Sequence, residues 1–408
     1  MADNNYVLLN KDVPVLNFTF AENPNIHTPL IRNINEVYNL HYAPLPLAAR
    51  RGDKTGLFDL NYWWVQRGMA CFLRSRSISA LENTVNYERY YGIMRQSGGR
   101  SLNDHYWIKQ EKDSRTYAEV NFFDNPFPED FGDLFLLKED RCLSPEQMFT
   151  PDLTLAGHSF KTWKNGGKGG HFLCRIPVRE REIYNDLAAA EIFKIFGIDH
   201  VEYLPGTVGK MPVSVSKNFV SKDTEYCSFR SLANGIRYFD TGYLPKLLGS
   251  EKHEKILQDA YKIALIAYAV NNGDVELGIL RRTDTLEITG LAPVFDFADA
   301  FWYGSVKEVQ LHTTILQEIG DNLPYYVHAA GLDMTLWDGV IPAVQKVFDL
   351  CDDFRPGEAD HIYQQMALRI AALRQAAAKP VGTVRKNWPL EEMWTLWMNH
   401  KSFEGNVE

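Results

Sequence analysis

The chain has 408 residues, of which 45% are hydrophobic and 23% charged, and its formal net charge at pH 7 is −9. This composition is that of a globular protein and excludes global disorder, and the length predicts two or three domains or lobes. The negative charge argues against a general nucleic-acid binder, which is usually basic.

The five cysteines are scattered and odd in number, and no Cys-x-x-Cys pair occurs. They predict reduced thiols in a cytosol, not a disulfide framework or a zinc site. The N-terminal sequence MADNNYVLLNKDV lacks a basic segment followed by an apolar core, so we expect no signal peptide. No apolar run reaches about 18 residues, so we expect no membrane span and a cytoplasmic protein.

Residues 1–150 form the first predicted region, an α+β segment rich in aromatic residues that we interpret as a packed core. LIRNINEVYNLHY carries apolar residues at helical spacing from Leu30 to Leu40 and predicts a helix. Two further aromatic stretches, NYWWVQRGM and LNDHYWIK, follow along the chain. The proline, glycine and polar residues of NFFDNPFPEDFGD predict an ordered loop. The region shows no phosphate-loop pattern and no metal-ligand spacing.

Residues 151–225 form the second predicted region, a small β-rich lobe. Short alternating stretches around glycines predict two strands, with NGGKGG, residues 165–170, at the hairpin turn. EIYNDLAAAEIFKIFGI predicts a helix that ends near Gly197, and HVEYLPGTVGKMPVSVSKNFV resumes the strand pattern. The order β-β-α-β-β suits a small sheet with one helix packed on it.

Residues 226–408 form the third predicted region, a mainly helical lobe. EKILQDAYKIALIAYAV predicts a buried helix, and LEITGLAPVFDFADAFWYG inserts a short strand and a polar turn. Three further helices are expected near 335–353, 357–378 and 389–400, because prolines punctuate this part of the chain. A small β-rich lobe followed by a helical lobe is the layout of a kinase.

Phosphoryl transfer needs backbone amides around phosphates, a cation, a base and carboxylates for magnesium. The stretch AGHSFKT, residues 156–162, is a candidate phosphate loop, because its glycine lets the backbone approach phosphate and Lys161 adds positive charge. A glycine in a hairpin is more often only a turn. The motif alone therefore leaves both interpretations open.

Arg175 in FLCRIP is the candidate cation, and Asp186 in the following helix is its candidate partner. Each has a structural alternative, since a charge in a strand also marks a sheet edge and an acid in the first turn of a helix suits the helix dipole. Asp296 in LAPVFDFADAF is the candidate magnesium ligand, with Asp299 as the nearby alternative. Either of these two carboxylates can equally be a helix cap.

Taken in order, these motifs resemble the HipA family of serine/threonine kinases and its shorter CtkA-like relatives. TLAGHSFKT is similar to the family's phosphate-loop segment, LCRIP to the strand that carries its ATP-contacting lysine, and LAPVFDFADAFWYG to its metal-binding aspartate segment. YNDLAAAEIFKIFGI resembles the family's Asn-Glu helix, and MPVSVSKNF resembles the strand leading into the hinge. SLNDHYWIK and NFFDNPF look like the N-terminal region of Gram-positive and phage-borne HipA-like proteins.

The resemblance implies an α+β fold with two kinase-like lobes and an N-terminal extension, and it implies ATP and Mg2+ as ligands. The residues that it assigns to the nucleotide come from the phosphate loop, the next strand and the helix: Gly157, His158, Ser159, Lys161, Arg175 and Asp186. It assigns Glu276 and Asp296 to the metal. It places Thr154 where the family carries a phosphorylatable serine, which makes this threonine a candidate for self-modification.

The sequence departs from the family in the loop YAVNNGDVELGILRR, residues 268–282. The family's catalytic loop reads roughly Asn-Thr-Asp-Arg-His-x-x-Asn-Phe-Gly. An ungapped alignment puts Asn271 on the catalytic aspartate, and an amide cannot accept a proton as a carboxylate does. A loop shortened by three residues puts Asp274 there instead, and both alignments put Glu276 at the second metal position. We favour the ungapped alignment, because it needs no gap inside a buried segment.

Two functions follow from these departures. Arg175 in place of lysine, Asn271 in place of aspartate and Glu276 in place of asparagine predict either a weak or retuned Ser/Thr kinase or an inactive pseudokinase that acts as a regulatory scaffold. A protein substrate or a protein partner is expected in both cases. Direct nucleic-acid binding is not expected, although HipA proteins often act with DNA-binding antitoxins in toxin–antitoxin systems.

Overall fold

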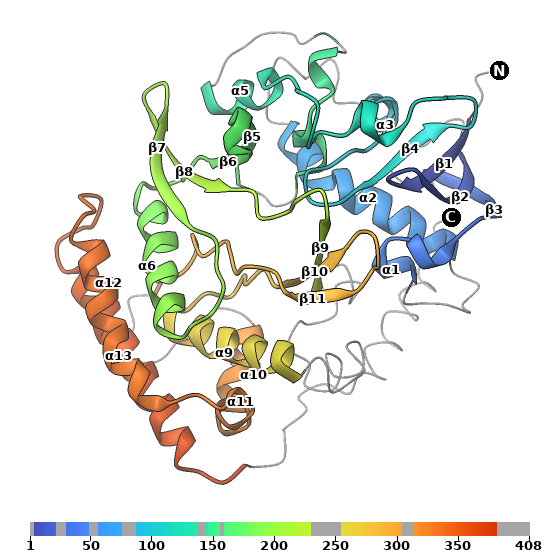
Figure 1. Ribbon diagram of the computed structural model, residues 1–408. Helices are drawn as coiled ribbons and strands as arrows, with labels where there is room; N and C mark the ends of the chain where they lie inside the picture. The colour runs from blue at the N-terminus through green and yellow to red at the C-terminus, as the bar shows by residue number, and fades with distance from the viewer. Residues whose placement is uncertain are drawn as a thin grey trace, which may run out of the picture.

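The computed structural model describes residues 4–21, 30–48, 56–75, 87–137, 144, 146–155, 159–229, 254–303 and 314–381. In these ranges the fold is α+β, with three antiparallel sheets and with the helices of the carboxyl-terminal part gathered at the end of the molecule opposite the N-terminal sheet (Figure 1). No helix in these ranges combines the length and the apolar character that crossing a bilayer requires.

The N-terminal region is built on a four-stranded sheet in the order β3-β2-β1-β4. Its elements are β1 (Asn5–Asn10), β2 (Val13–Phe20), β3 (Ile31–Val37), α1 (Leu45–Ala48), α2 (Gly56–Ser75), α3 (Tyr87–Gln96), β4 (Tyr106–Gln110), α4 (Tyr117–Val120) and α5 (Asp130–Leu137). Apolar side chains of the sheet pack against Leu60 and Trp64 of α2, both buried. The prediction that the aromatic residues of this region form a packed core is confirmed.

The helix predicted around Leu30 and Leu40 is wrong, because Ile31–Val37 form the edge strand β3. β3 pairs with β2 in an antiparallel register that places Ile34 opposite Phe18. The β-branched residues of this segment suit a strand. Pairing with β2 therefore outweighs an apolar spacing that also fits a helix.

The small lobe is a second four-stranded sheet, in the order β5-β6-β8-β7, with one helix beside it (Figure 1). Its elements are β5 (Lys161–Asn165), β6 (His171–Arg175), α6 (Arg181–Ile195), β7 (Tyr203–Val208) and β8 (Met211–Lys217). This confirms the predicted order β-β-α-β-β. NGGKGG forms the β5–β6 turn, where Gly167 and Gly170 adopt positive φ values that favour glycine.

Two element boundaries differ from those expected. The predicted loop NFFDNPFPEDFGD ends as a helix, because α5 begins at Asp130. α6 begins at Arg181, five residues before Asp186. Asp186 therefore lies beyond the first turn of the helix, and the helix dipole does not account for its presence.

The helical lobe begins with a three-stranded sheet in the order β11-β10-β9. Its elements are β9 (Thr224–Ser228), α9 (Glu254–Val270), β10 (Gly278–Arg282), β11 (Ile288–Leu291), α10 (Thr314–Asp321), α11 (Leu323–Ala330), α12 (Val340–Phe348) and α13 (Glu358–Ala377). The predicted boundary between residues 225 and 226 falls inside β9. The helix expected at 389–400 lies outside the described residues.

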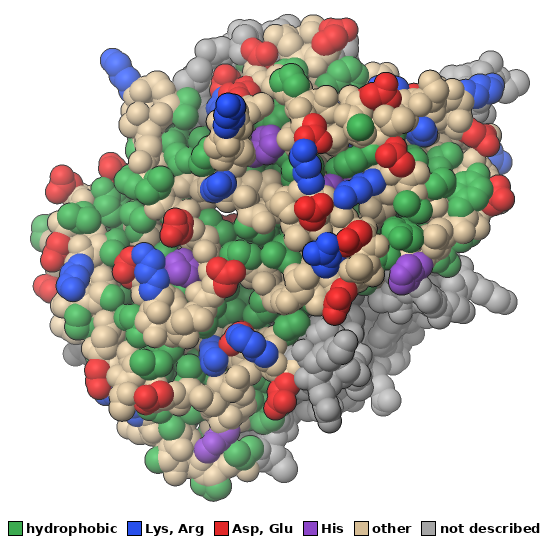
Figure 2. All heavy atoms as spheres, in the orientation of Figure 1, with side chains coloured by type: hydrophobic (Ala, Val, Ile, Leu, Met, Phe, Trp, Pro, Cys, Tyr) green, Lys and Arg blue, Asp and Glu red, His purple; other side chains and the backbone are tan. Residues whose placement is uncertain are grey.

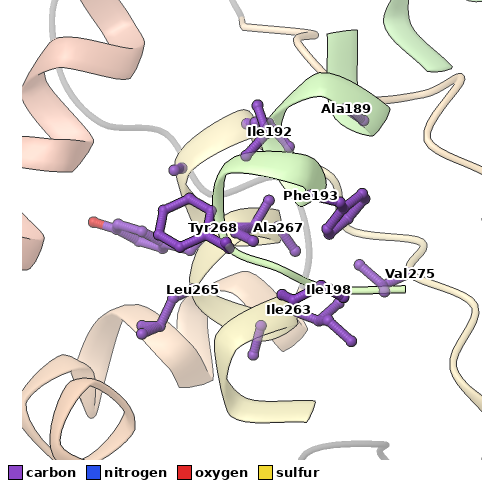
Figure 3. Packing of buried hydrophobic residues seen from close by; sticks show 14 of the residues in the cluster. Ala189, Ile192, Phe193, Ile198, Ile263, Leu265, Ala267, Tyr268 and Val275 are labelled. Atoms are coloured by element: carbon purple, nitrogen blue, oxygen red, sulfur yellow. The ribbon is translucent and has the colours of Figure 1, made fainter. Parts of the chain in front are cut away.

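The largest core joins α6 to α9. Figure 3 shows Ile192 and Phe193 of α6 beside side chains of α9. From Ile263 to Val270 no residue of α9 exposes more than 4% of its surface, as expected of a helix that is apolar on every side. The carboxyl-terminal end of α9, where the 271–276 loop begins, is therefore firmly held.

Buried polar contacts fix the N-terminal region to β9, the strand that follows the small lobe. Arg281 Nε donates to Glu225 Oε1 at 2.6 Å, and Arg281 Nη2 donates to the Tyr106 hydroxyl at 2.7 Å. His105 Nε2 lies 2.9 Å from the carbonyl oxygen of Thr224. The N-terminal region thus supports the segment that connects the two lobes.

Candidate functional site

Lys161 and Arg175 face each other across the β5–β6 hairpin as direct partners in the antiparallel register. Direct partners project from the same face of a sheet, and these two are buried, with 9% and 7% of their surface exposed. β6 lies between β5 and β8, so the alternative that Arg175 marks a sheet edge is excluded. Like charges in direct opposition are destabilising, so this pair needs nearby anions.

Asp186 and Asp296 supply that negative charge. Arg175 Nη2 donates to Asp186 Oδ2 at 2.5 Å, and Arg175 Nη1 donates to Glu182 Oε2 at 3.4 Å. Lys161 Nζ lies 3.6 Å from Asp296 Oδ2. The hairpin therefore brings one cation to an acid of α6 and the other to an acid of the segment that follows β11.

The backbone of Asp296 is left-handed, with φ of +66°, a conformation that is strained for a non-glycine residue and is enriched at functional sites. Its N–H donates to the Tyr203 hydroxyl at 2.9 Å, and Asn272 Nδ2 lies 3.5 Å from its carbonyl oxygen. The next N–H, that of Phe297, donates to Asp186 Oδ1 at 2.9 Å. Contacts from three separate segments hold this conformation.

The charges of the cluster interact strongly. Burial raises the pKa of the Asp186 carboxyl to about 6; Arg175 opposes this rise and Asp296 adds to it. Burial alone lowers the pKa of the Arg175 guanidinium, but the carboxylates of Asp186 and Asp296 outweigh burial and hold that pKa above its ordinary value. Burial, followed by the same two carboxylates, raises the pKa of the Tyr203 hydroxyl well above its ordinary value.

Asn271 is turned into the helical lobe and exposes 4% of its surface. Its Oδ1 accepts a hydrogen bond from Arg369 Nη2 at 2.8 Å, and its Nδ2 donates to the carbonyl oxygen of Trp302. Its φ is +56°. Both ends of the side-chain amide are thus bonded to groups inside the lobe.

Asp274, by contrast, is exposed. Its N–H donates to Asn272 Oδ1 at 3.1 Å, a local bond that favours a tight turn. Burial raises the pKa of the Asp299 carboxyl, and the charges of Asp296 and Asp274 contribute to that rise. The Asp274 carboxylate is therefore close enough to Asp299 to act on it electrostatically.

The backbone of Glu276 lies next to the segment that carries Asp296. It forms an isolated antiparallel bridge with Phe295, and its side chain is half-buried. Across the ranges described above, no three His, Cys, Asp or Glu side chains gather closely enough to hold a metal ion by themselves.

The sequence-predicted phosphate loop is described only in part. Gly157 and His158 lie outside the described residues, and Ser159 is half-buried two residues before β5. Lys161 is the member of this motif that the structure brings to Asp296.

Thr154, the candidate for self-modification, is buried in the 3-10 turn of residues 151–154. Its hydroxyl lies 2.9 Å from the carbonyl oxygen of Arg100 and 3.0 Å from that of Pro151, as a donor to both. Phosphorylation of this hydroxyl therefore requires the turn to open.

Three half-buried aromatic rings lie next to the charged cluster, and we call them the aromatic triangle: Phe219, Tyr226 and Phe295. Their centroids are 5.6 to 5.7 Å apart. A Cβ on Gly278 would come within 2.4 Å of the Tyr226 ring, so this glycine makes room for the triangle. Figure 2 shows that the molecular surface is hollowed between the small lobe and the helical lobe, with charges of both signs around the hollow.

Reasoning from the sequence missed three residues that support the site: Tyr203, Asn272 and Arg369. Tyr203 bonds to a residue 93 positions away, and Arg369 bonds to one 98 positions away. Neither carries a local pattern that signals such a contact. For Asn272 the Asn-Asn-Gly-Asp cluster was a signal of a polar turn, without indicating which asparagine holds the loop.

No protein-family model matches the sequence, and no curated protein matches it. A solved structure does. HipA from the Shewanella oneidensis MR-1 toxin–antitoxin system, in a complex with HipB and its operator DNA, matches 92% of this chain and 100% of its own. The sequence identity is 12% and the TM-score is 0.55. The chain has the HipA-like kinase fold.

A second match is the Helicobacter pylori proinflammatory kinase CtkA, which covers 53% of this chain and 94% of its own at 14% identity. Its TM-score is 0.38. At these identities the likeness establishes the HipA-like fold and not the chemistry. In that fold the cluster of Lys161, Arg175, Asp186 and Asp296 lies where the small lobe meets the helical lobe.

Proposed function

We propose that this chain is a HipA-like protein kinase that binds ATP with Mg2+ and transfers phosphate to a serine or threonine of a protein. The observation that carries the proposal is the convergence of Lys161, Arg175 and Asp296. Phosphoryl transfer needs cations for the phosphates and a carboxylate for the metal in one place. Two cations from one face of the hairpin and one carboxylate in a left-handed backbone meet that need.

The residues present suit a magnesium nucleotide. Mg2+ in phosphate sites is usually bound by one or two carboxylates together with phosphate oxygens, so Asp296 with Glu276 is a sufficient protein contribution. Lys161 and Arg175 would hold phosphate oxygens through charge-assisted hydrogen bonds. The aromatic triangle offers a stacking surface for the base. The bound metal would neutralise part of the negative charge on the phosphates.

We assign Asp274 to the acceptor hydroxyl. Asn271 is bonded inside the helical lobe, whereas Asp274 is exposed, and its loop adjoins the Asp296 segment through the Glu276–Phe295 bridge. As the hydroxyl oxygen forms its bond to phosphorus and ADP leaves, Asp274 would take the hydroxyl proton. This assignment corresponds to the alignment with the shorter loop.

The alternative is a catalytically inactive pseudokinase that acts as a regulatory or partner-binding scaffold. Arg175 favours this alternative, because its Nη1 and Nη2 are both bonded to carboxylates, those of Glu182 and Asp186. Its charge is thereby directed towards α6. In that case a bound nucleotide would stabilise the fold by mass action without reacting.

The proposal includes a cytoplasmic location and a protein as substrate or partner. The scattered cysteines suit a reducing compartment, and the net charge of −9 gives no reason to expect direct nucleic-acid contact. The HipB complex of the Shewanella HipA is the precedent for proposing a toxin–antitoxin partner. Thr154 remains the proposed site of self-modification, subject to the opening of its turn.

Labelled ATP with Mg2+, followed by mass spectrometry of the protein, tests the proposal. We expect label on a serine or threonine of the wild type and none with Asp296→Asn. Asp284→Asn is the matched control, because Asp284 is an exposed acid on the β10–β11 turn that pairs with Arg282. If the folded wild type carries no label, the proposed kinase activity is excluded. A rise in Tm with ATP and Mg2+ would then favour the pseudokinase, and no rise would leave a scaffold that does not bind nucleotide.

A further inference from the structure

The carboxyl-terminal end of α9 is capped by the loop that follows it and by groups from other parts of the chain. A helix leaves its last four carbonyl oxygens without partners inside the helix. Each of these four oxygens accepts a hydrogen bond here: Ala267 from Asn272 N–H at 2.9 Å, Tyr268 from Arg369 Nη1 at 2.5 Å, Ala269 from the Tyr303 hydroxyl at 2.7 Å, and Val270 from Phe301 N–H at 2.6 Å. The cap therefore joins α9, α13 and the segment that follows Asp296.

Arg369 of α13 is the charged member of this cap and has no exposed surface. Its guanidinium carbon lies 5.3 Å from the ring centroid of Tyr268 and 5.1 Å from that of Tyr303. A cation between aromatic faces is stabilised by both rings, and a cation at the carboxyl-terminal end of a helix interacts favourably with the helix dipole. Its Nη2 donates to Asn271 Oδ1 at 2.8 Å.

Asn271 and Asn272 extend this contact to both sides of the site. Asn271 Nδ2 donates to the carbonyl oxygen of Trp302, in the segment that follows Asp296. Asn272 accepts the N–H of Asp274 at 3.1 Å and lies 3.5 Å from the carbonyl oxygen of Asp296. One continuous set of contacts thus connects the buried guanidinium to the two segments that carry the proposed acids.

We propose that Arg369 is a positioning residue which, through Asn271, fixes the 272–274 loop against the 296–302 segment and so places Asp274 opposite Asp296. The inference rests on the proposed function, because its consequence is for phosphotransfer. Arg369 acts from α13, on the inner side of the loop, and reaches the reacting groups only through the asparagines. The same inference assigns a role to Asn271, which holds the loop and takes no part in proton transfer.

Arg369→Met tests this role, because methionine keeps an unbranched apolar stem between the two rings and removes the donors. We expect kcat to fall about 100-fold, as for a small misplacement of reacting groups, while KM for ATP with Mg2+ changes by less than about threefold. Arg369→Lys keeps the charge and should recover about tenfold of the loss. Arg374→Met is the matched control on the same helix, since Arg374 pairs with Asp338 at the surface, and should change neither constant.

Backbone hydrogen exchange gives a second measurement that needs no catalysis. In Arg369→Met we expect faster exchange in residues 270–274 and 301–303, with exchange in α6 unchanged. Faster exchange in a protein that transfers no phosphate would support the positioning role and overturn the proposed function alone. Unchanged exchange in a folded Arg369→Met variant, or parallel losses of kcat and ATP binding, would overturn the positioning role.

Asn271→Ala provides the same test from the other side of the contact, should Arg369→Met fail to fold. It removes both amide hydrogen bonds and leaves the buried guanidinium in place. The expected pattern is again a lower kcat, an unchanged KM and faster exchange in residues 270–274. Wild-type kcat and wild-type exchange in this variant would overturn the inference.

Discussion

In the small lobe, Arg175 and Asp186 form a buried ion pair at 2.5 Å, where the resemblance to the HipA family leads one to expect lysine and glutamate. In the helical lobe, Asn271 stands where an ungapped alignment expects aspartate. In the first case a longer base meets a shorter acid, and the two form an ion pair. The second change has no such partner, and the exposed carboxylate of that loop is Asp274, three residues later.

The difference teaches that sequence alignment assigns the role of a residue more reliably in packed strands and helices than in a loop. β6 and α6 fix where Arg175 and Asp186 point, so the two side chains meet as an ion pair. The 271–276 loop can turn a different residue towards the site when its length changes. Asn271 can then bond to Arg369 inside the helical lobe.

The largest expected effect separates the two acids of the helical lobe. Asp274→Asn should lower the phosphotransfer rate by about 10²- to 10⁴-fold, the usual contribution of a positioned acid–base group. The rise in Tm with ATP and Mg2+ should stay, because Lys161, Arg175 and Asp296 are intact. Asp284→Asn is again the control, and a rate within about threefold of wild type for Asp274→Asn would contradict the assignment.

The pairing of a longer base with a shorter acid in the small lobe predicts that substitutions of Arg175 and Asp186 are coupled. Arg175→Lys and Asp186→Glu should each destabilise the fold by about 1–3 kcal/mol, and the double variant should recover most of the loss. Urea denaturation of the four proteins measures this coupling. A double variant whose loss equals the sum of the two single losses would show that the residues are not matched by length.

The pH dependence of stability tests whether burial or the ion pair dominates at Asp186. Its pKa of about 6 lies above the ordinary value for aspartate, so the folded state binds the proton more tightly than the unfolded state does. The stability of the wild type relative to Asp186→Asn should therefore decrease by about 1 kcal/mol as the pH rises from about 5 to about 7. An increase over the same range would mean that Arg175 outweighs burial.

Local patterns predicted the elements that carry the site, and long-range contacts set the rest. The β5–β6 hairpin, α6 and α9 follow from alternation, glycine punctuation and continuous apolar character. The strand β3 was missed because its identity depends on pairing with β2. The direction of Asn271 depends on Arg369, 98 residues away, and the support of Asp296 depends on Tyr203, 93 residues away. No local pattern contains these contacts.

The most direct test of the account is to restore the carboxylate that the ungapped alignment expects. Asn271→Asp should not raise the phosphotransfer rate above that of the wild type, because it keeps the acceptor for Arg369 and loses the donor to Trp302. The double variant Asn271→Asp with Asp274→Asn should stay as inactive as Asp274→Asn alone. The reason is that a carboxylate at position 271 would face Arg369 and not the acceptor hydroxyl. A gain of about 100-fold in either protein would contradict the account and identify Asn271 as the lost catalytic position.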